Sequence, residues 1–312
     1  MHYGGRSGIG SGFEGLRALF AEKVLQSLKM TEHEKNATRR LFVEDQSKNP
    51  PPKHVFDRLL RRFGRASYFV VVLLLYVVAS TAIGLAIAPA LWCFHYLAGW
   101  CAALPGPLYW LGIATSGALC FFVAGLALLV VIPVYNWVLP TRIQPFKGGY
   151  YTIYAVPWFL HNGLFYLVRF TFLPFVTLTP FGTWFLKAMG MKIGRHAFIN
   201  TEYISDPQLI TLGDDAALGG SVRIFAHHGG GGNLVIAPVE IGARATIGLG
   251  ATVMGDVIVG DGATVLPNSV LLPGSRVGAG EVWGGVPAQR IEREDLDRLK
   301  EGIRGVRPLE MG

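Results

Sequence analysis

Two adjacent histidines, His227 and His228, stand directly before a run of four glycines, Gly229 to Gly232. A neutral imidazole has an unperturbed pKa of about 6.5, so it can take a proton from one group and return it to another near neutral pH. The two histidines are therefore the candidate catalytic residues. The backbone N–H groups of the glycines are candidate donors to an oxyanion. The alternative is that both histidines are solvated residues of a loop shaped for access by a partner.

A metal site is the other chemistry that histidines suggest. Catalytic zinc needs three well-placed protein ligands. His196, His227 and His228 are the histidines between residues 191 and 291, and an adjacent pair is awkward geometry for one ion. We therefore expect no metal.

The histidines interrupt a repeat with a period of six residues. Apolar side chains recur at every sixth position, at Ile241, Ile247, Val253, Val259, Val265, Leu271, Val277 and Trp283, and the position after each is mostly small. A period of six fits neither a helix nor a two-faced strand. It predicts three short parallel strands in each turn, stacked into a parallel β-helix. The step breaks between Ile224 and Ile241, so the histidines lie on a loop that leaves a rigid scaffold.

The repeat and the closing segment from Trp283 to Ala288 resemble the hexapeptide-repeat acyltransferases. Together with the apolar segments before it, the region of about residues 145 to 291 is similar to the membrane-bound C-terminal domain of peptide synthetases of the poly-lysine type. The resemblance implies a left-handed β-helix and a homotrimer that holds acetyl-CoA or another acyl-CoA between subunits. It also implies a histidine on the extruded loop as general base, which favours His227 over His228.

The same resemblance suggests residues for the acyl-CoA. Trp283 either caps the apolar column or stacks on the ligand, and Gly284 and Gly285 allow the pantetheine arm to approach closely. Arg290 and Arg293 are candidate contacts for the CoA phosphates, although family members carry the cation one position earlier, where this chain has Gln289. Five carboxylates are candidate partners of the catalytic histidine: Glu202, Asp206, Asp214, Asp215 and Glu240.

The segment before the repeat is unusually apolar. Only 16% of the 312 residues are charged and 51% are hydrophobic, and residues 66 to 141 contain no Asp, Glu, Lys or Arg. The turn at Leu104 to Pro107 divides this stretch into two spans, around Tyr68 to Trp92 and Leu108 to Val131. Each is long enough for the roughly 20 residues that cross a bilayer. Basic residues flank the hairpin while its loop is uncharged, so both ends are expected in the cytoplasm.

The predicted order is therefore a cytoplasmic N-terminal segment (1–65), a transmembrane hairpin (66–148), interfacial or re-entrant helices (149–190), the β-helix (191–291) and a helical tail (292–312). Pro157, Pro174 and Pro180 cut the interfacial region into short pieces. Arg169 is interpreted there as a snorkelling residue or a lipid-phosphate contact. His161 is interpreted as a polar group of the membrane interface.

These features predict a multi-pass protein of the inner (cytoplasmic) membrane, with its catalytic domain in the cytoplasm. The expected activity is transfer of an acyl group to a hydroxyl or amine of a membrane-associated acceptor. The alternative is a non-catalytic trimeric platform for a synthetase or a polymer-export machine. The net charge of +7 comes mostly from the N-terminal segment, and the repeat lacks the basic surface that nucleic-acid binding needs.

Overall fold

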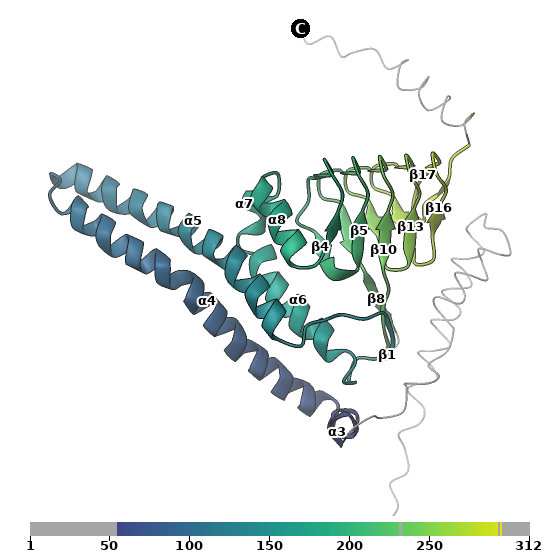
Figure 1. Ribbon diagram of the computed structural model, residues 1–312, viewed down its shortest axis with the longest axis horizontal. Coiled ribbons are helices and arrows are strands. Elements are labelled where there is room, and N and C mark those ends of the chain that lie inside the picture. The colour runs from purple at the N-terminus through teal and green to yellow at the C-terminus, as the bar shows by residue number, and fades with distance from the viewer. Residues whose placement is uncertain (1–54, 231–232, 293, 295–312) are drawn as a thin grey trace, which may run out of the picture. The chain divides into compact units, whose positions relative to one another are not determined.

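The computed structural model describes residues 55–292 and 294, apart from 231 and 232. Most of the predicted N-terminal segment (1–65), most of the predicted tail (292–312) and Arg293 lie outside the described residues. A short helix, α3 (Val55–Phe63), precedes two long helices, α4 (Arg65–Cys101) and α5 (Gly106–Val138). These two helices pack along each other as an antiparallel hairpin (Figure 1).

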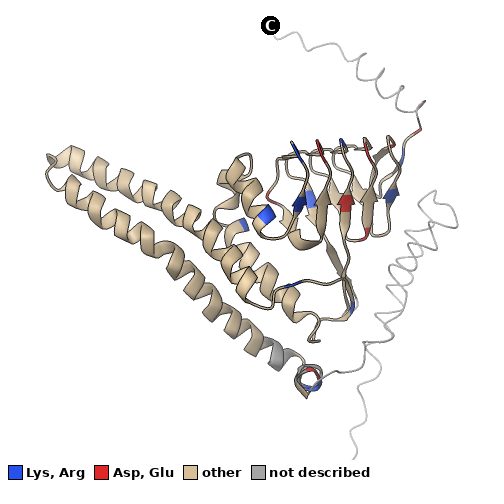
Figure 2. Cartoon of the chain, in the orientation of Figure 1, with Lys and Arg blue, Asp and Glu red and all other residues tan. Residues whose placement is uncertain are grey.

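Both long helices have the length and composition to cross a membrane. The spans Phe69–Cys101 and Gly106–Val138 each have 33 residues and a mean hydropathy of 2.6. Only 11% and 28% of their most apolar windows are buried, whereas the core helix of a soluble protein is mostly buried. Figure 2 shows charged residues on the solenoid and on the shorter segments around it, and none along most of the hairpin. The two predicted spans are confirmed as helices and extend further than the sequence suggested.

Three shorter helices connect the hairpin to the repeat: α6 (Val156–Arg169), α7 (Leu173–Val176) and α8 (Pro180–Ala188). Each has a proline in its first turn, Pro157, Pro174 and Pro180, where the missing N–H leaves no helical hydrogen bond unmade. Each proline therefore lies at the start of a helix, and the region consists of short helices separated at the three prolines that the sequence analysis singled out. Close contacts fix the connection to the hairpin, since a Cβ at Gly125 of α5 would lie 2.1 Å from the ring of Phe172.

The repeat forms a parallel β-helix with three faces, as predicted (Figure 1). One face contains β2 (Lys192–Ile193), β5 (Ile210–Leu212), β10 (Val239–Ile241), β13 (Val257–Val259) and β16 (Arg276–Val277). The second contains β3 (Phe198–Ile199), β6 (Ala217–Leu218), β11 (Thr246–Ile247), β14 (Thr264–Val265), β17 (Val282–Gly284) and the antiparallel β18 (Gln289–Arg290). The third contains β4 (Ile204–Ser205), β7 (Arg223–Phe225), β12 (Thr252–Val253) and β15 (Val270–Leu271).

The six-residue period has a direct structural cause. From Ile241 to Val277 the residues of the apolar column are at most 3% exposed, and each strand pairs with the strand one full turn later, as Val239 does with Val257. The corners between strands fall at every sixth residue and have positive φ, at Arg244, Gly250, Asp256, Gly262, Asn268, Gly274 and Gly280. Glycine, asparagine and aspartate tolerate this left-handed conformation best, which explains most of the corner residues.

The break in the repeat is a β-hairpin. β8 (His227–Gly230) pairs antiparallel with β9 (Asn233–Ile236), and β9 pairs with β1 (Phe146–Gly149), the strand that follows the second long helix. Val239 still pairs with Ile210 in the preceding turn, so the hairpin lengthens this one turn without disturbing the stack. The segment expected to be an extruded loop is thus held in a small three-stranded sheet.

One continuous hydrophobic core joins these parts. It runs from Ala82, Leu129 and Ile132 of the long helices through Phe165 and Phe185 to the apolar column of the solenoid. The helices between the hairpin and the repeat therefore pack as part of one structure, and they reach the place where the repeat is interrupted.

Candidate active site

His227 forms a hydrogen-bonded pair with Asp206. The Nδ1 atom of His227 lies 2.5 Å from Oδ2 of Asp206. The Asp206 side chain is completely buried, and the His227 side chain is 22% exposed. Asp206 directly follows β4 and adopts a φ of 61°, a left-handed conformation that aspartate tolerates better than most residues. Of the five carboxylates that the sequence left open, the structure places this one on the histidine.

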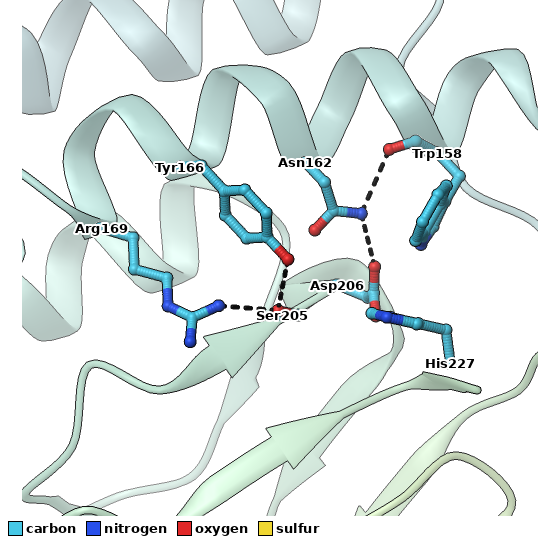
Figure 3. Close-up of polar contacts among 7 residues, drawn as sticks. All are labelled: Trp158, Asn162, Tyr166, Arg169, Ser205, Asp206 and His227. Atoms are coloured by element: carbon cyan, nitrogen blue, oxygen red, sulfur yellow. Dashed lines mark hydrogen bonds and ion pairs between the residues drawn. The ribbon is translucent and has the colours of Figure 1, made fainter. Parts of the chain in front are cut away.

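Helix α6 supplies a second partner for the carboxylate. The Nδ2 atom of Asn162 donates to Oδ1 of Asp206 at 2.6 Å and to the backbone oxygen of Trp158 at 3.1 Å (Figure 3). Asn162 is 5% exposed. Each oxygen of the buried carboxylate thus has its own donor, one from the helix and one from the imidazole.

Aromatic rings fix the plane of the imidazole. The ring of Trp158 meets the His227 ring edge to face at 5.0 Å between centroids, and Phe225 lies at 6.0 Å. Because a carboxylate at Nδ1 favours the proton on that nitrogen, the Nε2 atom of neutral His227 carries the free lone pair. The arrangement can therefore orient a general base, as the carboxylate of a Ser-His-Asp triad orients its histidine.

His228 lies in a different environment. It is half-buried, and its Nδ1 atom has no hydrogen-bond partner among the described residues. Burial lowers the pKa of His228, and the neighbouring His227 and Lys147 act in the same direction, while Asp256 opposes them. Among the described residues no carboxylate is hydrogen-bonded to the ring of His228, so the geometry favours His227 as the base.

A further buried histidine joins three parts of the chain. The Nδ1 atom of His161 lies 2.7 Å from Oδ1 of Asn136 on α5 and 3.0 Å from Nε2 of Gln208 on the first turn of the solenoid. Burial lowers the pKa of His161 to about 4, and Asp206 opposes this shift. His161 therefore packs as a neutral group in the interior.

The residues suggested for acyl-CoA lie together at the end of the solenoid. Trp283 and Gly284 are in β17, paired with Arg290 and Gln289 of β18, and the N–H of Gly285 donates to Oγ of Ser269. Glu281 accepts from Nε1 of Trp283 at 2.9 Å and pairs with Arg290 at 3.2 Å. Arg290 also lies 3.4 Å from Glu292, so in this state its guanidinium is held by carboxylates.

The remaining candidates lie apart from His227. His196 pairs with Asp215 at 3.4 Å on an exposed corner, and Asp214 pairs with Arg195 at 2.8 Å. Asp256, which the sequence suggested as a turn residue, has a φ of 65° at a corner. Of Glu202 and Glu240, the structure brings neither onto the histidine among the contacts of the described residues. Nor do three or more His, Cys, Asp or Glu side chains gather in the part of the chain that the structure describes.

Sequence reasoning missed the contribution of α6. Trp158, Asn162, Tyr166 and Arg169 are spaced by four, four and three residues, which places them along one face of the helix. All four point toward the segment from Ser205 to His227 (Figure 3). A polar stripe at helical spacing within an apolar region was the signal that would have identified them.

Comparisons with known proteins found likenesses in sequence and in structure. No protein-family model matches the chain. A stretch of 168 residues, 53% of the chain, is 23% identical to the delta-poly-L-ornithine synthetase of Acinetobacter baumannii, and 133 residues are 31% identical to an uncharacterized protein of Dictyostelium discoideum. The matches span 12% and 53% of those two proteins.

Two solved structures illustrate the likeness in fold. A hexapeptide-repeat acetyltransferase of Vibrio cholerae is 24% identical with a TM-score of 0.31, over 34% of this chain and 63% of that one. A maltose O-acetyltransferase of Clostridium difficile is 15% identical with a TM-score of 0.38, over 48% and 93%. The chain is thus similar to hexapeptide-repeat acetyltransferases in structure and, distantly, to part of a poly-ornithine synthetase in sequence.

Proposed function

We propose that the protein is a membrane-anchored acyltransferase that moves an acyl group, with acetyl-CoA or another acyl-CoA as donor, to a hydroxyl or amine of a membrane-associated acceptor. The observation that carries this proposal is the His227–Asp206 pair. A buried carboxylate on Nδ1 and a partly exposed ring leave Nε2 as an oriented base at the hairpin that interrupts the repeat before Ile241.

The proposed step balances as a general-base acyl transfer. The acceptor oxygen or nitrogen attacks the thioester carbonyl while Nε2 of His227 takes its proton. The tetrahedral intermediate then collapses, the C–S bond breaks, and the proton passes from Nε2 to the departing thiolate, so that CoA leaves as a thiol. Asp206 stabilises the imidazolium that exists between the two transfers. Such a base contributes about 10²- to 10⁴-fold, and positioning of the reactants supplies much of the rest.

The proposed setting is the cytoplasmic face of the inner membrane. The two long apolar helices support membrane anchoring, and the basic residues on either side of the hairpin support a cytoplasmic solenoid. Exposed apolar side chains on and between the short helices support contact of this region with lipid. They are Phe170, Phe175, Leu178, Phe181 and Trp184. In this arrangement the helix that contacts Asp206 lies beside the bilayer, which suits an amphiphilic acceptor. Acyl-CoA would bind between subunits of a trimer, near Trp283, Gly284, Gly285, Arg290 and Arg293.

A release assay tests the proposal. The full chain in detergent, given acetyl-CoA and a crude membrane extract as the source of acceptor, should release free CoA thiol. His227→Ala should reduce the rate by about 10² or more. His196→Ala is the matched control, because His196 also pairs with an aspartate but on an exposed corner. Undiminished release by the His227→Ala variant would overturn the assignment.

The second candidate function is a non-catalytic trimeric platform for a synthetase or a polymer-export machine, and the likeness to part of a synthetase favours it. It predicts no thiol release by the wild-type chain with any short acyl-CoA. It also predicts that His227→Ala leaves association with a synthetase unchanged.

A further inference from the structure

Arg169, at the C-terminal end of α6, is a buried cation without an acidic partner among the described residues. The residue is 6% exposed, and its Nη1 atom donates to Oγ of Ser205 at 3.0 Å. Its Nε atom is buried without a hydrogen-bond partner, and no carboxylate in the part of the chain that the structure describes forms an ion pair with it. Arg169 therefore does not snorkel. A buried charge that lacks a counter-ion is costly, which points to an anion that is absent from the protein itself.

Aromatic rings surround the guanidinium. Its carbon lies 5.2 Å from the centre of the Tyr166 ring, 5.1 Å from Phe170 and 5.6 Å from Tyr203. The rings hold the guanidinium in place by cation–π attraction but do not neutralise its charge. The hydroxyl of Tyr166 lies 3.1 Å from Oγ of Ser205, so a second polar group reaches the same point (Figure 3).

A second arginine approaches from the solenoid. Arg223, in β7, lies 5.8 Å from the centre of the same Tyr203 ring and is exposed. Two guanidinium groups, one buried and one exposed, thus lie close to the same tyrosine ring. A phosphate group accepts paired hydrogen bonds from arginine, and two arginines match its charge.

We propose that Arg169 and Arg223 bind the phosphate of the headgroup of a lipid-linked acceptor. The ring of Phe170, which contacts the Arg169 guanidinium, is itself 67% exposed, so an apolar surface adjoins this site and favours a phosphate attached to a lipid over a soluble one. Asn162 and Arg169 lie two helical turns apart on α6, about 10 Å along the helix axis. A headgroup of roughly that length, held by its phosphate, would present its accepting hydroxyl or amine near His227. The role as acceptor rests on the proposed function, whereas the phosphate site does not.

Binding can be measured without acyl-CoA. The full chain in a nonionic detergent is titrated with dihexanoyl phosphatidic acid, with neutral dihexanoylglycerol and inorganic phosphate as comparisons. The phosphatidic acid should bind the wild-type chain tightest. Arg223→Gln should weaken it by about tenfold or more, since charge-assisted hydrogen bonds are lost. Arg169→Gln should weaken it further, and Arg169→Lys should retain part of the affinity.

Arg195→Gln is the matched control because Arg195 is an exposed arginine of the solenoid that is already paired with Asp214. Arg223→Gln keeps the test valid if loss of the buried Arg169 prevents folding. Equal affinity of the wild-type and Arg223→Gln chains, or absence of binding, would overturn the proposal. Equal binding of inorganic phosphate would overturn the lipid source, and displacement by CoA would assign the site to the acyl donor instead.

Failure of this site and failure of the proposed function give different results. His227→Ala should lose thiol release but keep its affinity for phosphatidic acid. If thiol release survives in His227→Ala while Arg223→Gln loses phosphate binding, the acyl-transfer assignment is wrong and the phosphate site stands.

Discussion

The Nδ2 atom of Asn162, on a helix beside the apolar hairpin, lies 2.6 Å from Oδ1 of Asp206, on the first turn of the solenoid. The other carboxylate oxygen of Asp206 contacts His227. Asp206 is therefore the point at which the helical and the repetitive parts of the chain meet the candidate base. A change on either side of this carboxylate should alter the properties of the imidazole.

Asp206→Asn should remove the carboxylate that orients His227 while conserving size. An amide at this place can present its NH₂ group to Nδ1, which would stabilise the wrong tautomer, with the proton on Nε2. We expect thiol release to fall by on the order of 10²- to 10⁴-fold. Rates are compared with those of Asp215→Asn, which alters the exposed pair with His196 and should leave turnover unchanged. An Asp206→Asn chain with wild-type turnover would remove the dyad from the mechanism.

Asn162→Ala should act through Asp206, as a positioning residue. The buried Oδ1 atom loses its donor, so the carboxylate becomes a poorer anchor for the imidazole, and turnover should fall by about tenfold or more. Asn162→Asp should reduce turnover further, because it places a second carboxyl group against that of Asp206. The measurement is the pH profile of kcat/KM, whose acid limb should move in both variants. A loss of activity with an unmoved profile would indicate a purely structural role.

His161 predicts a pH dependence of stability. Its pKa in the folded chain is about 4 against 6.5 when unperturbed, so the unfolded chain binds more protons between these values. The contribution of His161 to the free energy of unfolding should therefore be at its full value above pH 6.5. It should decline as the pH falls toward 4, by a few kcal/mol at most. Thermal unfolding from pH 7 to pH 5 should show a smaller decline for His161→Gln than for wild type. His196→Gln, at an exposed position, should follow wild type.

Gly125 is a packing contact between α5 and the start of α7. A Cβ there would lie 2.1 Å from the Phe172 ring, whereas at Gly117 of the same helix nothing lies within 4 Å. Gly125→Ala should lower the thermal unfolding midpoint, with a cost of about 1–3 kcal/mol from overpacking. Gly117→Ala should be neutral or slightly stabilising, since alanine is the better helix former. Equal midpoints for the two variants would contradict the packing described here.

The solenoid and the hairpin were readable from sequence because each depends on a local, repeated rule. Each coil of the solenoid is defined by apolar residues at every sixth position and by small or turn-forming residues at its corners. Neither feature depends on residues far away in the chain. The two long helices are likewise predicted from a local feature, the absence of charged residues from 66 to 141. The structure confirms both. The interruption between Ile224 and Ile241 was located correctly. Its form, a hairpin paired with Phe146–Gly149, was not foreseen, because antiparallel pairing between segments far apart in the chain leaves no periodic trace.

The candidate site was only partly predictable for the same reason. The interruption of the repeat singled out His227 and His228, and only the resemblance to acyltransferases favoured His227. Asp206 was one of five carboxylates that the sequence could not rank. Their contact depends on a left-handed residue after β4 and on a strand one turn later. Asn162 and Trp158 were missed, since they lie far from both residues in the chain, in a segment interpreted as membrane contact. The role of His227 as a base stays a prediction until the variants are measured.

The three-stranded sheet and α6 have a practical consequence for dissection of the protein. A fragment excised at Met191, where the repeat begins, would keep every turn of the solenoid, His227 and Asp206. It would lack the strand that borders β9, the amide that contacts the aspartate and the indole against the imidazole. Excision would also expose the end of the hydrophobic core that the solenoid shares with the helices. The histidine's surroundings would be incomplete in such a fragment, so its inactivity would say nothing about the intact chain.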